Sequence, residues 1–225
     1  MGKLVVIVVS LIIPVLACLY AIYKRHWLPF LLGMIAFTTS QLLIRIPIIN
    51  YISEHSTTYH LWSVTKPFLI IGLLALSAGF FEEIARWIII KYFLKIRTTA
   101  AGIWFGLGHG GIEAVILVGI PIIGVSALSA SPIDFYHSGI ERFCAIIVHV
   151  CLSLIVMMGV NTSRFRYCIY SILLHGLLNF GVVSASLIMS QKYTIVVLLA
   201  LTALNISITY FIYRRKNNEK SVSIN

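Results

Sequence analysis

Carboxylate and imidazole side chains recur in this 225-residue chain at places where the surrounding sequence is almost entirely apolar. Both kinds of side chain can transfer protons in catalysis, and both bind zinc. An ionisable residue inside a membrane-spanning run costs about 2.5–3.5 kcal/mol on insertion scales, so such residues are candidates for function. They lie in four consecutive apolar runs, which contain Glu82, Glu83 and Arg86, then His109 and Glu113, then Glu141, Arg142 and His149, and finally His175 with Asn179.

Helical spacing predicts which of these side chains can meet. Residues three or four positions apart share one helix face, as do Glu83 and Arg86. At a rise of about 1.5 Å per residue, Glu83 lies about 12 Å and His175 about 14 Å from the basic ends of their runs. On the same basis, His109 lies about 18 Å and His149 at most about 22 Å from those ends. We therefore expect one polar layer in the half of the molecule nearer the basic loops.

A second group is expected closer to the opposite end of the runs. It consists of Glu113, Glu141 and Arg142, and the arginine could pair with either carboxylate. Purely structural interpretations exist as well, because Glu82 and Arg86 could form only an intrahelical ion pair that permits insertion. The occurrence of several ionisable groups at similar depth favours a functional site over isolated structural pairs.

The composition indicates a chain embedded in lipid, since 60% of its residues are hydrophobic and only 11% are charged. Soluble domains carry about 25% charged residues. A span needs about 20 mostly apolar residues, and a continuous apolar run can satisfy its backbone only as a helix. We predict an all-α, polytopic membrane helix bundle, a single domain over residues 1–225 with polar loops at 50–66 and around 120–138. The seven expected spans cover roughly residues 4–23, 28–49, 67–90, 100–119, 139–160, 167–189 and 193–213.

The basic residues predict an orientation. Eleven of the 17 lysines and arginines fall on one side of the seven-span arrangement, in the loops after spans 1, 3 and 5 and in the C-terminal tail. Basic loops stay in the cytoplasm, so we expect the N-terminus outside and the C-terminus inside a cell membrane. The net charge of +10 therefore indicates contact with membrane lipid, and nucleic acid is not an expected partner.

The cluster could hydrolyse a peptide bond without a covalent nucleophile. A buried carboxylate can act as general base for water, and a nearby histidine can orient that water. A second histidine with an asparagine can donate hydrogen bonds to the developing oxyanion. Serine chemistry lacks support, because no Gly-x-Ser-x-Gly elbow is present. The favoured function is an intramembrane endopeptidase that cuts a peptide or membrane-protein substrate, needs no cofactor and opens towards the cytoplasmic half.

Other interpretations stay open. Zinc is the nearest alternative, because imidazole and carboxylate groups are suitable ligands, although no His-Glu-x-x-His motif occurs. Its expected ligands would be His109, Glu113, His149 and His175. Buried glutamate and histidine could also form a proton relay in a transporter, although the internal repeat common in carriers is not found. A non-catalytic membrane scaffold is a further alternative.

Three short motifs in successive spans resemble the CAAX-protease and bacteriocin-processing (CPBP) superfamily. They are Glu-Glu-Ile-Ala-Arg at 82–86, the segment 105–109 that ends in histidine, and the segment 175–179 that runs from histidine to asparagine. Within that superfamily, the chain looks most like the bacterial YhfC family of glutamic-type intramembrane proteases. The resemblance covers about residues 78–182 and includes His-Gly-Gly-Ile-Glu at 109–113.

The resemblance implies a water-activating group and an oxyanion hole. The first would consist of Glu82 or Glu83 with His109, and the second of His175 and Asn179. The Glu-Glu-x-x-Arg spacing is one residue shorter than the superfamily pattern, which leaves open which glutamate faces the site. Positions 113 and 149 also resemble a PrsW-like pattern. The residues expected to support the site are Arg86, Glu113, Glu141, Arg142 and His149.

Overall fold

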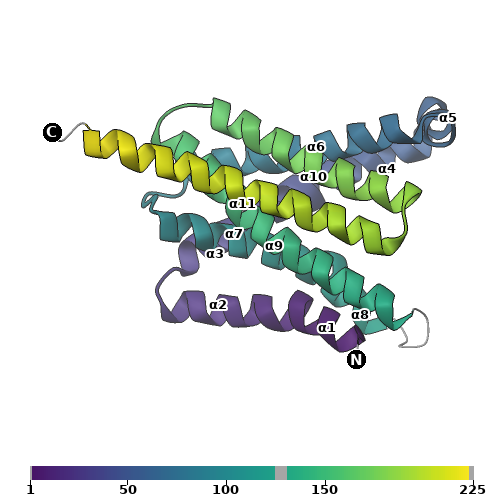
Figure 1. Cartoon of the computed structure of the whole chain (residues 1–225), viewed down its shortest axis with the longest axis horizontal. Helices are drawn as coiled ribbons and strands as arrows, with labels where there is room; N and C mark the ends of the chain where they lie inside the picture. Colours follow the sequence, from purple (N-terminus) through teal and green to yellow (C-terminus); the bar gives the residue numbers. More distant parts are fainter. Residues whose placement is uncertain (1, 125–130, 223–225) are drawn as a thin grey trace.

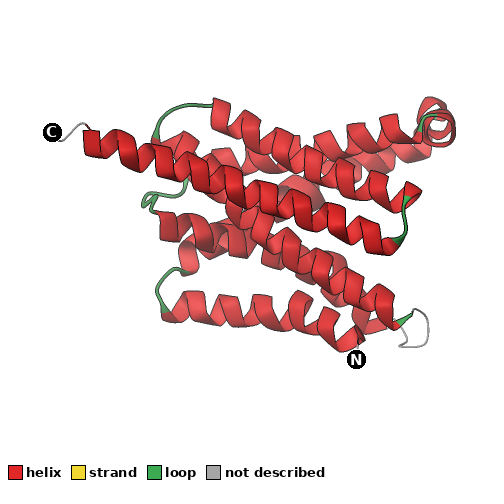
Figure 2. Cartoon of the chain, viewed as in Figure 1, coloured by secondary structure: helices red, strands yellow, loops and turns green. Residues whose placement is uncertain are grey.

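The computed structural model describes residues 2–124 and 131–222, which form helices joined by short turns, with no strand among them (Figure 2). Seven helical stretches are long and apolar enough to cross a membrane, and they lie side by side in one bundle (Figure 1). The predicted all-α membrane bundle is thus confirmed. The stretches are Gly2–Tyr23, Trp27–His55, Pro67–Tyr92, Thr99–Gly124, Ile133–Asn161, Arg166–Ile188 and Gln191–Arg215.

Four spans are continuous α-helices, and three contain a π-helical segment. The continuous helices are α6 (Pro67–Tyr92), α9 (Pro132–Asn161), α10 (Arg166–Ile188) and α11 (Gln191–Val222). The first span consists of α1 (Gly2–Ile7), η1 (Val8–Ile12) and α2 (Ile13–Tyr23). The second consists of α3 (Trp27–Phe37), η2 (Thr38–Arg45) and α4 (Ile46–His55), and the fourth of α7 (Thr99–Ala114), η3 (Val115–Gly119) and α8 (Ile120–Gly124).

Each of these π-helical segments ends two residues before a proline, which is Pro14, Pro47 or Pro121. Proline lacks a backbone N–H, and its ring crowds the carbonyl four residues earlier, so it disturbs the α-helical bonding upstream. A wider turn accommodates that disturbance without ending the span. Such π-helical turns are frequent at functional sites. The segment η2 is of this kind, because it carries Gln41 and Arg45 towards the polar cluster.

Helix α9 forms the centre of the bundle. The most apolar stretch of its span is 72% buried, whereas that of α11 is 22% buried. Helix α9 contacts α1, α6, α7, α10 and α11. Its approach to α7 requires glycine, because a Cβ atom at Gly106 would lie 2.4 Å from Cα of Val150. On another face of α7, a Cβ at Gly108 would lie 2.0 Å from the carbonyl oxygen of Phe30. These close approaches bring the histidine of α7 into the bundle interior.

The prediction of a polar loop at 50–66 was wrong. The second span continues to His55, and a further helix, α5, covers Thr57–Thr65. Ser56 separates the two helices, and its hydroxyl accepts a hydrogen bond of 3.1 Å from the backbone N–H of Tyr59. Serine is a favoured N-cap residue, so the sequence did contain a local signal for this helix start.

The loop expected around 120–138 is shorter than predicted at both of its described ends. Helix α8 takes up 120–124 and α9 begins at Pro132. The start of α9 is stabilised by a capping box, in which Ser131 and Asp134 bond reciprocally through side chains and backbone. The middle of the expected loop, residues 125–130, lies outside the described residues.

Candidate active site

The carboxylate of Glu82 lies at the centre of the polar cluster. Its Oε2 atom is 2.9 Å from Nε2 of His109 and 4.0 Å from Nδ1 of His149. Its Oε1 atom is 3.9 Å from Nε2 of His175. The glutamate comes from α6 and the histidines from α7, α9 and α10, so four spans converge at this point. Each of these four residues is at most 4% exposed.

Three of these residues could hold a metal ion. Glu82, His109 and His149 each offer one ligand atom, and the three atoms lie within 4.8 Å of one another. One carboxylate and two imidazoles form a known ligand set of catalytic zinc sites, in which a fourth position is left for water or substrate. The donor chemistry of the buried cluster therefore fits a divalent ion such as zinc.

The ring of His149 has the orientation that a metal ligand needs. Its Nε2 atom lies 2.5 Å from Oε2 of Glu113. We assign the ring hydrogen to that nitrogen, so Nδ1 keeps a lone pair on the side of Glu82. Ligand histidines commonly donate their second N–H to a carboxylate in this way. Nη2 of Arg86 lies 3.0 Å from Nδ1, and a bound cation would replace this arginine contact.

The adjacent glutamate has a different environment. Nη1 of Arg86 lies 2.6 Å from both oxygens of Glu83, and Nδ1 of His175 lies 2.9 Å from its Oε1 atom. The carboxylate is 0% exposed, so the arginine compensates a charge that would otherwise be buried alone. Nδ1 of His175 therefore donates to Glu83, and Nε2 is the ring nitrogen that faces the Glu82 carboxylate, 3.9 Å from Oε1.

Gln41 and Arg45 are site residues that the sequence reasoning missed. Nε2 of Gln41 donates to Oε1 of Glu82 over 2.5 Å, and Nη1 of Arg45 donates to the amide oxygen of Gln41 over 3.0 Å. Arginine can only donate, so it fixes the amide with its oxygen outward and its nitrogen towards Glu82. Arg45 is itself held on α6 by Ser77 Oγ at 3.0 Å and the carbonyl of Leu74 at 2.7 Å.

A usable sequence signal for this pair was present. Gln41 lies four residues before Arg45, so the two share a helix face, and Pro47 follows two residues after the arginine. Gln41 is uncharged, so it is not one of the ionisable residues that stand out within the apolar runs. Its importance depends on the contact with α6, which spacing within one helix does not reveal.

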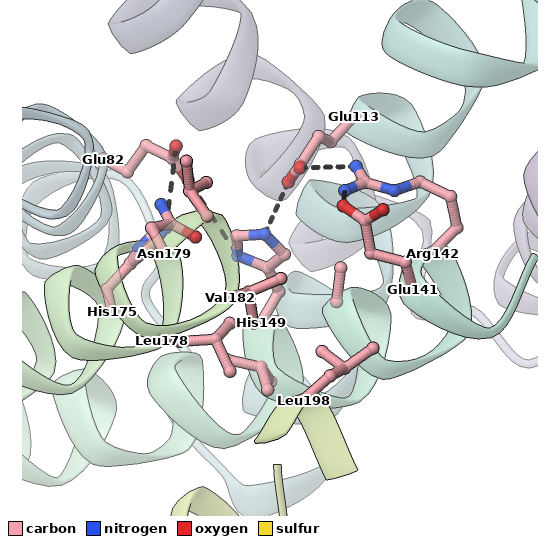
Figure 3. Close-up of a pocket in the computed structure, with 13 residues that line it drawn as sticks. Glu82, Glu113, Glu141, Arg142, His149, His175, Leu178, Asn179, Val182 and Leu198 are labelled. Carbon is pink, nitrogen blue, oxygen red and sulfur yellow. Dashed lines mark hydrogen bonds and ion pairs between the residues drawn. The ribbon is translucent and has the colours of Figure 1, made fainter. Parts of the chain in front are cut away.

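An ion-pair network extends the cluster towards the end of the bundle where α9 begins. Arg142 contacts Oε1 of Glu113 at 2.9 Å and Oε1 of Glu141 at 2.7 Å. The sequence left open which carboxylate Arg142 would pair with, and the structure has both pairs. These side chains border a cavity of about 100 Å³ that His149 and Asn179 also line (Figure 3).

This polar cavity leads away from the basic end of the bundle, contrary to the expected opening towards the basic, cytoplasmic half. It shares Glu141, Val182 and Leu198 with a further cavity of about 130 Å³. The second cavity is lined by His137 near the start of α9 and by Gln191 at the start of α11. The cavity leads in this direction because the paired side chains of Glu141 and Arg142 on α9 continue the polar lining towards the start of that helix.

The structure brings the residues singled out in the sequence into one region. Nine of them form one network of hydrogen bonds and ion pairs, in which Glu82 is joined to His149 and His175 over 4.0 and 3.9 Å, and Asn179 lines the adjoining cavity. The three-ligand group differs from the zinc ligands expected from the sequence, since it contains Glu82 and lacks Glu113 and His175. Between the two adjacent glutamates, Glu82 is the one that lines the cavity.

Fold and site together define a polytopic membrane protein with a buried carboxylate–imidazole group suited to binding a metal ion. More narrowly, the chain belongs to the YhfC intramembrane metalloprotease family, whose family model matches residues 7–131 and 121–203. The predicted YhfC membership is confirmed. Neither the CPBP superfamily nor the PrsW-like pattern is tested by this match, and both stay predictions. The metalloprotease description favours the zinc alternative over the expectation of no cofactor.

A curated relative supports the membrane location. The chain is similar to the uncharacterized membrane protein YhfC of Bacillus subtilis (strain 168), with 33% identity over 135 residues. The match covers 46% of this chain and 52% of the relative, so the chain spans about half the length of the curated relative it matches. No solved structure matches the chain.

Proposed function

We propose that this chain is a metal-dependent intramembrane endopeptidase whose ion is held by Glu82, His109 and His149. The observation that carries the proposal is the convergence of one carboxylate and two imidazoles in a buried site. The contact between Glu113 and Nε2 of His149 supports it, because it leaves the lone pair at Nδ1, where an ion would take the place of Arg86. The description of the family as metalloproteases points the same way.

Zinc in a site of this kind supplies Lewis acidity and activates water. The chain's own residues orient the ligands. Gln41 binds Oε1 of Glu82, so the other carboxylate oxygen is directed at the two ligand histidines. Glu113 holds the proton at Nε2 of His149, and Arg142 in turn compensates the charge of Glu113. The buried surroundings exclude bulk water and strengthen each of these interactions.

Proton transfer is assigned to the pair of His175 and Glu83. Glu83 accepts from Nδ1 of His175 and fixes the ring, as a carboxylate does for the histidine of a catalytic triad. Nε2 of His175 faces the cavity side of Glu82, where it can take a proton from water and return it to the leaving amine. Asn179, one turn further along α10, can donate from its amide to the carbonyl oxygen of the peptide.

This assignment changes the role that the resemblance implied for His175. A neutral ring that donates to Glu83 presents an acceptor at Nε2, so it suits a base better than an oxyanion donor. The glutamic alternative uses the same residues without a metal. It requires Glu82 to release Gln41 or His109, because both carboxylate oxygens are already hydrogen-bonded.

The metal content of the purified full-length chain is the first test. Wild-type protein grown with zinc should retain about one ion per chain, and Glu82→Gln, His109→Ala and His149→Ala should each lose it. His60→Ala is a matched control, because this histidine is exposed on α5. Retention of zinc in all three site variants would contradict the proposed ligands.

Cleavage of a panel of membrane-spanning peptides in detergent or bilayers is the second test. Activity should disappear with a strong chelator and return with zinc. Activity that survives complete removal of the metal, yet is lost in Glu82→Gln, would support the glutamic mechanism instead. A metal-loaded protein that cleaves no member of the panel would favour a transporter or scaffold.

We also propose the orientation with the C-terminus in the cytoplasm, from the distribution of basic residues. In that orientation the polar cavity beside Glu141 leads to the outer face. A reporter that is active only in the cytoplasm, fused after the last residue, should be active. Activity of the same reporter at the N-terminus instead would reverse the orientation.

A further inference from the structure

Two cavities of different character meet at the Glu82 cluster. One is the polar cavity of about 100 Å³ that follows the charged residues of α9 (Figure 3). The other is a cavity of about 270 Å³ between η2, α6, η3 and α10, and most of its wall is apolar. Both contain Glu82, Glu113 and Asn179 in their walls. The candidate catalytic groups therefore stand at the junction of a polar and a largely apolar space.

The polar cavity is suited to supply water. It joins the cavity lined by His137 and Gln191 at the end of the bundle, so polar groups follow the whole route from Glu141 to the cluster. Hydrolysis of each peptide bond consumes one water molecule, which the surrounding lipid cannot provide. This leaves the larger cavity as the space for the peptide.

The larger cavity has the groups that an extended peptide needs inside a bilayer. Unpaired backbone N–H and C=O groups cost several kcal/mol each in an apolar medium, so a bound peptide must find partners. Besides Glu82 and Glu113, the polar residues of this wall are Gln41, Arg45 and Asn179. Arg45 donates to three neutral acceptors, and a guanidinium has further N–H groups to offer. Among the described residues, no carboxylate forms an ion pair with it.

Beyond Arg45 lies a second space with almost no polar lining. This pocket of about 280 Å³ shares Arg45 and Leu74 with the cavity of about 270 Å³ that we assign to the peptide, so the two spaces adjoin. Its walls come from α4, α5 and residues 70–81 of α6, and α4 and α5 lie at one end of the bundle (Figure 1). Neither α4 nor α5 buries a residue, so this wall is packed against the bundle only loosely. Its apolar lining includes Ile48, Ile49, Ile52, Ile70, Leu73 and Phe81.

We propose that this pocket, the α4–α6 pocket, is a specificity subsite that binds one bulky apolar side chain, of the leucine or phenylalanine class, of a membrane-spanning peptide substrate. Leu74 lies eight residues before Glu82 on α6, which corresponds to about 12 Å. An extended peptide advances about 3.3–3.6 Å per residue. The side chain in the subsite is therefore three or four residues from the bond that is cut. The inference rests on the proposed function.

The subsite predicts a size preference that can be measured without catalysis. The probes are synthetic leucine–alanine spanning peptides with a central Gly-Gly pair and one variable residue, Ala, Val, Leu or Phe, three or four positions from it. Their binding to full-length Glu82→Gln protein is followed by fluorescence anisotropy. Peptides with Leu or Phe at the variable position should bind at least about 10-fold more tightly than those with Ala, because hydrophobic pockets discriminate between side chains of different size by such factors.

Two substitutions of one lining residue change the pocket in opposite directions. Ile49→Trp fills it, so the preference for Leu and Phe should disappear, and Ile49→Ala enlarges it, so Phe should gain over Leu. Ile44→Trp is the matched control, because Ile44 is 46% exposed on the same span and does not line this pocket. Circular dichroism and gel filtration confirm that each variant is folded. The opposite changes in the two Ile49 variants cannot both result from loss of structure.

Equal affinity across the panel, or the same preference in both Ile49 variants and the control, would overturn the subsite. Loss of co-purified lipid in Ile49→Trp with unchanged peptide binding would assign the pocket to an acyl chain and would also overturn it. Failure of the proposed function has a different signature. In that case wild-type protein with zinc cuts none of the peptides, while the size preference in binding persists.

Discussion

Polar residues inside the spans behave differently in the centre of the bundle and in α11. In the centre, Glu82 bonds to His109, 27 positions away, and Glu83 bonds to His175, 92 positions away. In α11, Thr202 donates to the carbonyl of Leu198 in its own helix, at 2.8 Å. Thr209 and Asn205 likewise donate to carbonyls four residues earlier. The buried carboxylates of the centre join helices through ionisable partners, whereas these three buried side chains of α11 donate to carbonyls of their own helix.

The difference follows from what a helix can offer a side chain in lipid. A hydroxyl can share the carbonyl four residues earlier, so serine and threonine enter a span at little cost. A carboxylate finds no free backbone N–H within its own helix, so it needs side-chain donors, which come from neighbouring helices or, for Glu83, also from Arg86 one turn away. Interhelical bonds between buried ionisable side chains therefore mark the functional centre, whereas bonds of hydroxyl groups within one helix do not.

The largest effect should come from the residue with most interhelical contacts. Glu82→Gln removes a charged ligand and replaces one of the two oxygens that accept from Gln41 and His109 by an NH₂ group. We expect cleavage to fall by at least about 10³-fold, since a loss of about 4 kcal/mol in transition-state stabilisation has that effect. The rate and the zinc content are measured on the same preparation. A variant that keeps more than a tenth of the wild-type rate would remove Glu82 from the active site.

The next largest effect is expected at Glu83. Glu83→Gln leaves Arg86 buried without its anion, and breaking a buried pair typically costs about 3–5 kcal/mol. Thermal unfolding in detergent should show a clear loss of stability. The double variant Glu83→Gln with Arg86→Met should recover much of that stability but not the cleavage rate, because His175 then has a neutral amide instead of its charged acceptor. Recovery of both would make Glu83 purely structural.

Ser40 and Gln41 are neighbours in η2, and they allow the most direct comparison of a bond within one helix with a bond between helices. Gln41 bonds to α6, whereas the hydroxyl of Ser40 donates to Ala36 in its own helix at 2.7 Å. Gln41→Leu should weaken zinc binding by about 10–100-fold, as loss of groups that orient metal ligands does. Ser40→Ala should leave it unchanged. The measurement is a competition titration against a zinc chelator. Equal effects of the two substitutions would break the distinction between the two kinds of bond.

The sequence predicted the bundle well, because a span is defined by local composition. All seven predicted spans are present, and Glu82, His109, His149 and His175 meet as their similar depths indicated. Gln41 was missed, because its role depends on the interhelical contact with Glu82 rather than on its charge. The separate environments of the adjacent glutamates were also unpredictable, since they depend on how α6 is rotated against α9 and α10. The cavities depend on packing of the whole bundle.

The smallest effect is expected in α11. Thr202 is buried and polar, as many site residues are, but its hydroxyl bonds within its own helix. Thr202→Val keeps the shape of the side chain and removes the bond to Leu198 and the weak contact with the thiol of Cys144, so stability should change by no more than about 1 kcal/mol. Zinc content and cleavage rate should match the wild type. A loss of activity as large as that of Gln41→Leu would mean that burial of a polar group in a span, and not its contact with another helix, identifies the functional residues of this bundle.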